Sequence, residues 1–190
     1  MARSTGTKRA ILDAALELAA SRGITGTTMD EVAERAGVAK GSLYYNFSSK
    51  DKLFEALLND GAHLLAERLN EAKGELRGWD AMRAIIAALL DSIQGNVPLA
   101  KLIAGEVFRT DRPWAESVNG FRQQAVGVFA AAIAEEQPKG ADSGLQSLMA
   151  SSVFGSVLSA GLEWLLFQPE RSRDEVVEAV IASHSGALAG

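Results

Sequence analysis

The stretch TTMDEVAERAGVAKGSLYYNFSSKDKL, residues 27–53, decides the fold. Thr28 and Glu31 have the spacing of a capping box, in which each side chain covers a backbone N–H left open at a helix start. A short apolar stripe follows, and Gly37 supplies the left-handed residue that ends the helix. Because the next helical run begins at Lys40, the pattern predicts a helix-turn-helix, whose second helix can enter a DNA major groove.

The second helix of this motif, residues 40–47, carries more hydrogen-bond donors than apolar bulk. A glycine at position 41 weakens a helix interior by roughly 1 kcal/mol relative to alanine. A packing element would not select glycine there, whereas close approach to a flat partner would. The alternative is that these are ordinary surface residues of a small helical bundle. The donors of the segment are Lys40, Ser42, Tyr44, Tyr45 and Asn46.

From Thr28 to Leu53 the residues match in register, and the segment resembles the signature of the TetR family of bacterial transcriptional regulators. The resemblance implies that Thr28, Tyr44 and Lys50 hold DNA phosphates. Lys50 also lies in the first turn of a third helix, where the helix dipole favours a phosphate. Asn46 stands where the family commonly has His; it can donate to a phosphate but cannot titrate. The residues implied to face base edges are Ala39, Lys40, Gly41, Ser42 and Tyr45.

Composition bounds the remaining possibilities. The chain has 190 residues, no Cys and a net charge of −5. Without Cys there is neither a disulfide framework nor a thiolate metal site. Residues 1–52 carry eight Lys and Arg against six Asp and Glu, while the other residues carry eleven against eighteen, so the positive end is the predicted DNA-binding end. No apolar segment of a signal peptide follows Met1, so we expect a cytoplasmic protein.

Apolar residues recur at helical spacing along the whole chain, which predicts an all-α fold. We expect an N-terminal three-helix bundle with the helix-turn-helix in residues 1–49. A larger C-terminal helical domain for ligand binding and dimerisation would occupy residues 50–190. After a polar arm at residues 3–6, helices are predicted at residues 7–22, 28–36, 40–47, 50–75, 78–94, 98–109, 113–136, 144–167 and 172–188, with Gly61 as a possible flexing point of the long helix.

The helices between Trp79 and Phe154 carry more large apolar side chains than a four-helix packing needs. Ordinary core is the alternative for each of them. As a set, they predict a mostly apolar pocket with few polar groups, binding one small-molecule effector per protomer. Arg109 is the candidate to hold a carboxylate or phenolate on that effector. The predicted lining is Met82, Ile86, Val107, Phe108, Arg109, Trp114, Phe121, Phe129, Met149 and Phe154.

Residues 144–167 hold a single charge, Glu163, and are formally long enough to span a membrane. Their serines and glycines are too polar for that, so we expect no membrane contact. Small residues every four positions instead allow another helix to come close, which predicts a homodimer. The predicted interface residues are Ser152, Gly155, Ser156, Ser159, Val177, Ile181 and His184.

Catalytic signatures are lacking. His63 and His184 lie on different predicted helices, and no phosphate loop or nucleophile motif occurs. We therefore expect no enzyme, no cofactor and no metal site. The leading hypothesis is a homodimeric transcriptional regulator, most often a repressor in such families. It would bind a palindromic double-stranded DNA operator and leave it when a small apolar ligand binds. The alternatives are a DNA-binding dimer without a ligand and a helical sensor or scaffold that does not bind DNA.

Overall fold

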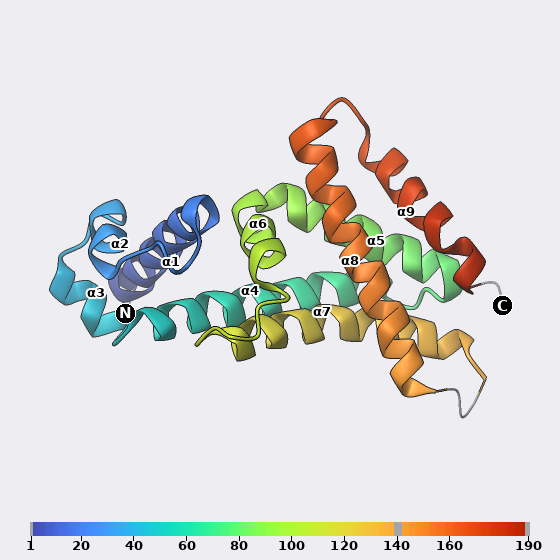
Figure 1. Ribbon diagram of the computed structural model, residues 1–190, viewed down its shortest axis with the longest axis horizontal. Helices are drawn as coiled ribbons and strands as arrows, with labels where there is room; N and C mark the ends of the chain where they lie inside the picture. Colours follow the sequence, from blue (N-terminus) through green and yellow to red (C-terminus); the bar gives the residue numbers. More distant parts are fainter. Residues whose placement is uncertain (1, 139–141, 189–190) are drawn as a thin grey trace.

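The computed structural model describes residues 2–138 and 142–188, and the elements within these ranges are all helices (Figure 1). The all-α prediction is therefore confirmed. The small N-terminal module lies at one end of the molecule, and the larger helical part lies at the other. The helices are α1 (Ala2–Arg22), α2 (Met29–Arg35), α3 (Lys40–Asn46), α4 (Lys50–Lys73), α5 (Gly78–Gly95), α6 (Val97–Glu106), α7 (Ala115–Glu136), α8 (Ser143–Phe167) and α9 (Arg173–Leu188).

Most helix boundaries lie within three residues of their predicted positions. The exception is the start of the chain, where residues 3–6 were expected to form a polar arm. They continue α1 instead, which begins at Ala2. No proline interrupts this segment, and the single Gly6 does not stop a helix that continues for four more turns.

The predicted capping box is present at the start of α2. The Thr28 Oγ1 accepts a hydrogen bond from the Glu31 N–H at 3.3 Å, and the Glu31 carboxylate accepts one from the Thr28 N–H at 3.0 Å. The hydrogen bond from the Thr28 hydroxyl, which favours the ionised form, lowers the pKa of Glu31 below its ordinary value. After α2, Gly37 has a φ of 65°, as its predicted role requires. These local features fix the short turn that places α3.

The helix α4 joins the two ends of the molecule. It packs against α1 of the N-terminal module and against α5 and α7 of the larger part. Its buried side chains run along its length from Leu53 to Leu69. They belong to one hydrophobic core that continues from the N-terminal module into the larger bundle. The orientation of the module therefore depends on how α4 is held.

Two glycines allow helices to pack closely in the larger part. An added Cβ at Gly161 of α8 would lie 2.9 Å from Ile93 Cδ1 and 3.1 Å from Leu90 Cδ2 of α5. At Gly61 of α4 it would lie 3.2 Å from Leu99 Cδ2. Gly61 was expected to be a flexing point, but the structure gives it a packing role, because α4 remains helical there and approaches α6.

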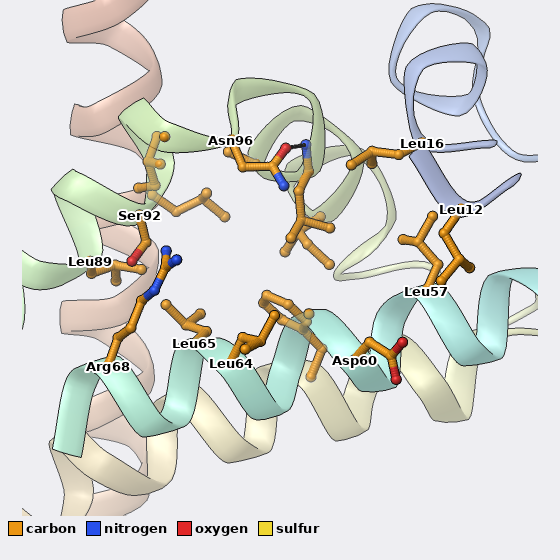
Figure 2. A pocket seen from close by; sticks show the side chains of 18 of the residues that line it. Leu12, Leu16, Leu57, Asp60, Leu64, Leu65, Arg68, Leu89, Ser92 and Asn96 are labelled. Carbon is orange, nitrogen blue, oxygen red and sulfur yellow. Dashed lines mark hydrogen bonds between the residues drawn. The ribbon is translucent and has the colours of Figure 1, made fainter. Parts of the chain in front are cut away.

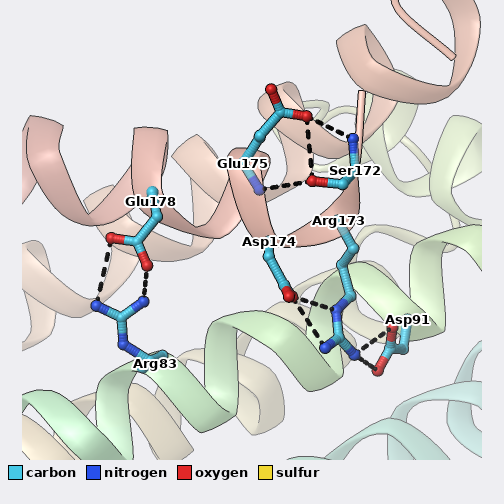
Figure 3. Close-up of polar contacts among 7 residues, drawn as sticks. All are labelled: Arg83, Asp91, Ser172, Arg173, Asp174, Glu175 and Glu178. Atoms are coloured by element: carbon cyan, nitrogen blue, oxygen red, sulfur yellow. Dashed lines mark hydrogen bonds and ion pairs between the residues drawn. The ribbon is translucent and has the colours of Figure 1, made fainter. Parts of the chain in front are cut away.

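The last helix, α9, is held against α5 by charged side chains at its outer edge (Figure 3). Arg83 of α5 pairs with Glu178 of α9, and Arg173 of α9 pairs with Asp91 of α5 at 2.9 Å. A second capping box, formed by Ser172 and Glu175, starts α9. Since these pairs are exposed, they contribute little, and the buried valines of α9 contribute most of the docking free energy.

We predict that Gly161→Leu lowers the free energy of unfolding by about 1–3 kcal/mol or more, because the new side chain would overpack the contact between α8 and α5. Urea denaturation followed by circular dichroism measures the change. The control is Gly127→Leu, at an exposed glycine of α7 where an added Cβ meets no described atom within 4 Å. Equal midpoints for the two variants would contradict the close contact at Gly161.

Candidate functional site

The recognition helix α3 presents a polar, exposed surface. Tyr45 is 90% exposed and Tyr44 is 50% exposed. Leu43, in contrast, is fully buried and holds the helix to the module. An added Cβ at Gly41 would meet no described atom within 4 Å, and the backbone of Gly41 is ordinary helix. No contact within the described part of the protein therefore requires a glycine at position 41. A glycine is expected at this position if the surface of α3 approaches an external partner closely.

Two predicted DNA-contacting side chains of α3 already have partners in the free protein. Lys40 Nζ lies 2.6 Å from the carboxylate of Asp30 on α2, and both side chains are exposed. The hydrogen bond to Asp30 raises the pKa of Lys40 above its ordinary value. Asn46 Nδ2 donates to the carbonyl oxygen of Ser42 at 2.8 Å. A nucleic acid would have to compete for Lys40, while Asn46 retains one N–H donor and its side-chain carbonyl oxygen for outside contacts.

Lys50 has a different contact from the one expected. Its Nζ lies 3.2 Å from the Ile24 carbonyl oxygen, 3.2 Å from that of Thr27 and 3.4 Å from that of Thr25. An ammonium group has three N–H donors, so these carbonyls occupy all of them. Lys50 thus ties the start of α4 to the loop between α1 and α2. A phosphate contact would require at least one of these bonds to open.

The other predicted DNA contacts lie at helix starts or on α3. Thr28 is exposed at the N-terminus of α2, where its hydroxyl belongs to the capping box. Ala39 is the exposed N-cap residue of α3 and makes no side-chain cap. Ser42 is half-buried, and its side-chain hydroxyl has no partner within the described part of the chain. The ion pair between Lys40 and Asp30 brings the first turns of α2 and α3 together.

A cavity of about 270 Å³, which we call the α4 cavity, lies between the N-terminal module and the larger bundle (Figure 2). The apolar side chains of six helices form most of its wall, and exposed charged residues form part of its rim. Its lining is Arg9, Leu12, Asp13 and Leu16 of α1; Leu57, Asp60, Gly61, Leu64, Leu65 and Arg68 of α4; Leu89, Ser92, Ile93 and Gly95 of α5; Asn96; Leu99, Ala100 and Ile103 of α6; Phe121 of α7; and Phe154 and Leu158 of α8.

Only two of the predicted pocket residues, Phe121 and Phe154, line the α4 cavity. Trp114 is buried, and its Nε1 donates to the buried Glu106 carboxylate at 3.0 Å. Phe108 is 87% exposed. A second, shallower hollow of about 350 Å³ on the face of α8 is lined in part by Val107, Phe108 and Phe154. The remaining predicted residues, Met82, Ile86, Arg109, Phe129 and Met149, line neither hollow, and Met82, Ile86 and Phe129 are core.

Sequence reasoning missed most of the cavity because its wall is shared between α1 and the larger bundle. One signal was available in α4. Positions 57, 61, 64 and 68 have the spacing of one helix face, and they hold Leu, Gly, Leu and Arg. A glycine and an arginine on an otherwise apolar face mark a place where the packing is incomplete.

The outer face of α8 is unusually apolar for an exposed surface. Leu148 is 70% exposed and Phe167 is 72% exposed. The predicted interface residues Ser152, Gly155 and Ser159 lie on this face and are exposed. We call the set that recurs every three or four residues the α8 stripe. It consists of Leu145, Leu148, Ser152, Gly155, Ser159, Leu162 and Leu166.

The other predicted interface residues point elsewhere. Val177 is buried within the protomer, and Ile181 is half-buried against the same core. Ser156 contacts His184 Nε2 at 3.4 Å, so these two side chains join α8 to α9 inside one protomer. The small-residue pattern of the sequence did not separate the inner from the outer face of α8, because both faces carry serines.

Ionisable groups are dispersed over the described surface. His63 lies on α4 beside Glu67 at 3.2 Å, far along the chain from His184 on α9. No cluster of three or more His, Cys, Asp or Glu residues in the described ranges is arranged to hold a metal ion. One helix, α8, is long and apolar enough to cross a membrane by length and composition alone. One side of this helix packs against α5, α6, α7 and α9, and its outer face is exposed.

The sequence and the fold both match known regulators. Residues 11–57 match the model of bacterial regulatory proteins of the tetR family. The chain is 34% identical over 98 residues to the HTH-type transcriptional regulator SrpR of Pseudomonas putida, a match that covers 49% of this chain and 45% of SrpR. It is also 34% identical over 98 residues to TtgW, an uncharacterized HTH-type transcriptional regulator of the same species, covering 49% of this chain and 71% of TtgW. The chain thus matches about half the length of the first of these relatives.

The fold is shared with a solved structure over nearly the whole chain. The transcriptional regulator FadR from Bacillus subtilis, solved in complex with stearoyl-CoA, superposes with a TM-score of 0.74 at 20% identity. The match covers 90% of this chain and 96% of FadR. Together with the helix-turn-helix geometry, these matches place the protein. The chain belongs to the TetR family of bacterial regulatory proteins.

Proposed function

We propose that this protein is a sequence-specific DNA-binding transcriptional regulator of the cytoplasm. It acts as a homodimer, most often as a repressor, and leaves its palindromic operator when a small apolar ligand binds. The single observation that carries the proposal is the surface of α3. It combines exposed Tyr44 and Tyr45 with Gly41, a glycine in the first turn of α3 that no described internal contact requires. An α-helix with this surface fits the DNA major groove.

Dimerisation is proposed through the α8 stripe. Its members recur at alternating spacings of three and four residues, the pattern of a helix seam that packs against another helix. Exposed leucines grouped at the two ends of such a seam are typical of an interaction site. A two-fold related copy would cover the leucines at both ends of the stripe, and the small residues at its centre would let the helices approach. The same pairing would place two α3 helices on one DNA molecule.

Control by a ligand is proposed through the α4 cavity. Its wall includes Leu12 and Leu16 of α1 as well as residues of the larger bundle, so an occupant touches both parts. A ligand that favours one orientation of the module changes operator affinity. By linkage, it must bind the operator complex more weakly than the free dimer by the same factor. The domain boundary at residue 50 is part of this proposal, since α4 begins there and connects the two parts.

We predict opposite effects of Gly41→Ala on stability and on DNA binding. Alanine should stabilise the fold by about 0.5–1 kcal/mol, because the added methyl group meets nothing internal. It should weaken operator binding about tenfold or more, because the methyl group blocks close approach to the bases. Thermal unfolding and fluorescence anisotropy with labelled operator measure the two effects.

The control for this prediction is Gly127→Ala, at an exposed helix-interior glycine. It should stabilise the fold to a similar extent without affecting DNA binding. Unchanged operator affinity in Gly41→Ala would show that α3 does not approach DNA at this residue.

We predict that Asp30 restrains Lys40. Asp30→Asn should increase affinity for random-sequence DNA by up to about fivefold, since it releases Lys40 from an exposed and therefore weak ion pair. Lys40→Ala should relax base preference at one position of each half-site, a contact worth about 1–3 kcal/mol of discrimination. Anisotropy titrations and binding-site selection measure these effects.

Glu34→Gln is the matched control, because it removes one negative charge from the same helix without releasing a lysine. An equal gain in affinity for Asp30→Asn and Glu34→Gln would assign the effect to net charge and would contradict a specific role for the ion pair.

We predict that Gly155→Leu breaks the dimer and leaves the protomer folded. An added Cβ at Gly155 meets no described atom within 4 Å, so the protomer accommodates leucine, whereas a close helix contact between copies loses about 1–3 kcal/mol or more. Sedimentation velocity should show a shift toward monomer at unchanged helicity, with Gly127→Leu remaining dimeric. An intact Gly155→Leu dimer would move the interface off the α8 stripe.

A further inference from the structure

We infer that the α4 cavity binds an anionic amphiphile, whose charged head is held by Arg68 and Asn96 and whose aliphatic tail extends along α4 to α1. This inference rests on the proposed ligand control, because it assigns a chemical class and an orientation to the occupant of the same cavity.

The end of the α4 cavity that would hold the charged head contains hydrogen-bond donors without an acceptor among the described residues. Arg68 has no hydrogen-bond or ion-pair partner within the described residues. In Figure 2 its guanidinium rises from α4 toward Ser92 and Leu89 of α5. Asn96 accepts a hydrogen bond from the Leu99 N–H at 3.1 Å through Oδ1, which caps α6. Its Nδ2 has no acceptor among the described residues and faces the cavity. Carboxylates and phosphates are the acceptors that pair best with donors of these two kinds.

The tail end is apolar and lies toward the N-terminal module. Leu57 of α4 faces Leu12 of α1 there, and Leu16 of α1 continues the wall (Figure 2). Eleven residues separate Leu57 from Arg68, which is roughly 16 Å along the helix. The space between them is bounded by further leucines of α4 and α6 and by two phenylalanines. An unbranched aliphatic chain of medium length fits this elongated apolar wall.

The charged residues at the rim of the α4 cavity determine the orientation of the ligand. At the α1 end, Arg9 is already paired with Asp13 at 2.9 Å, so it offers little free positive charge. Asp60 lies at the same end and has no partner in the described ranges, so it repels an anion. Arg68 at the other end is the cation of the lining without a partner there. An anionic head therefore goes to Arg68, and the tail goes to α1.

The orientation has a regulatory consequence. With the head fixed on α4 and Asn96, the length of the tail decides how far the ligand reaches between Leu12 and Leu16 of α1. Because α1 belongs to the DNA-binding module and also packs against α6, a chain that fills this end displaces the module relative to α4. The change in operator affinity should therefore depend more steeply on the length of the ligand's tail than on whether the head group is present.

The test is isothermal titration calorimetry of the protein in the absence of DNA, with octanoate, decanoate, decyl phosphate and 1-decanol as probes. We expect decanoate to bind about tenfold or more tightly than octanoate, since each buried CH₂ contributes about a fourfold change in Kd. We expect Arg68→Gln to weaken decanoate and decyl phosphate about tenfold or more and to leave 1-decanol unchanged. The tighter of the two anions identifies the head group.

Two further variants make the test specific. Arg109→Gln, at an exposed arginine outside the cavity, is the charge-matched control and should bind all probes as the wild type does. Asn96→Asp keeps the acceptor that caps α6 and replaces the amide donor with a negative charge. It should weaken the anions and spare 1-decanol, which separates loss of recognition from loss of folding.

Equal decanoate affinity in the wild type and Arg68→Gln, or no decanoate binding to the wild type, would overturn the inference. Operator binding of the same variants without probe is measured in parallel. Retained operator binding alongside absent decanoate binding would remove the amphiphile and leave the DNA-binding proposal standing. Specific decanoate binding without operator binding would support the amphiphile site and contradict the DNA-binding proposal.

Discussion

The apolar face of α4 is the feature on which the rest of the structure depends. Its buried side chains join the core of the N-terminal module to that of the larger bundle, so the two parts share one hydrophobic core. At its start, Lys50 binds three carbonyls of the loop between α1 and α2. The helix that holds the N-terminal module therefore also forms one wall of the α4 cavity. We propose that a change in that wall alters the position of α3, because only three residues separate α3 from α4.

Two surfaces of the protomer, the α8 stripe and the α4 cavity, are the basis of the proposals for dimerisation and ligand binding. The α8 stripe exposes leucines beside small residues, and the α4 cavity exposes Arg68 without a partner in the described chain. Burial of leucine and pairing of arginine are both favourable. We propose that a second copy of the protein covers the α8 stripe and that an anionic amphiphile occupies the α4 cavity.

Features that depend on neighbouring residues could be predicted from the sequence. The capping box of Thr28 and Glu31, the left-handed Gly37 and nearly all helix boundaries are local, and they are present in the structure. The α4 cavity could not be predicted from the sequence, because its lining depends on how α1 and α6 meet α4. Aromatic residues such as Trp114 and Phe129 are buried in the hydrophobic core instead, and Phe108 is exposed. The partners of Lys40 and Lys50 likewise come from other helices and loops, which spacing along one helix does not reveal.

The central claim is that α3 reads DNA as part of a two-fold symmetric dimer. Selection of binding sites from a random double-stranded DNA library with the purified protein tests it most directly. The account predicts enrichment of a palindromic sequence with half-site centres about one helical turn, roughly 34–36 Å, or a multiple of it apart. Enrichment of a single asymmetric site, or no enrichment at all, would contradict the account.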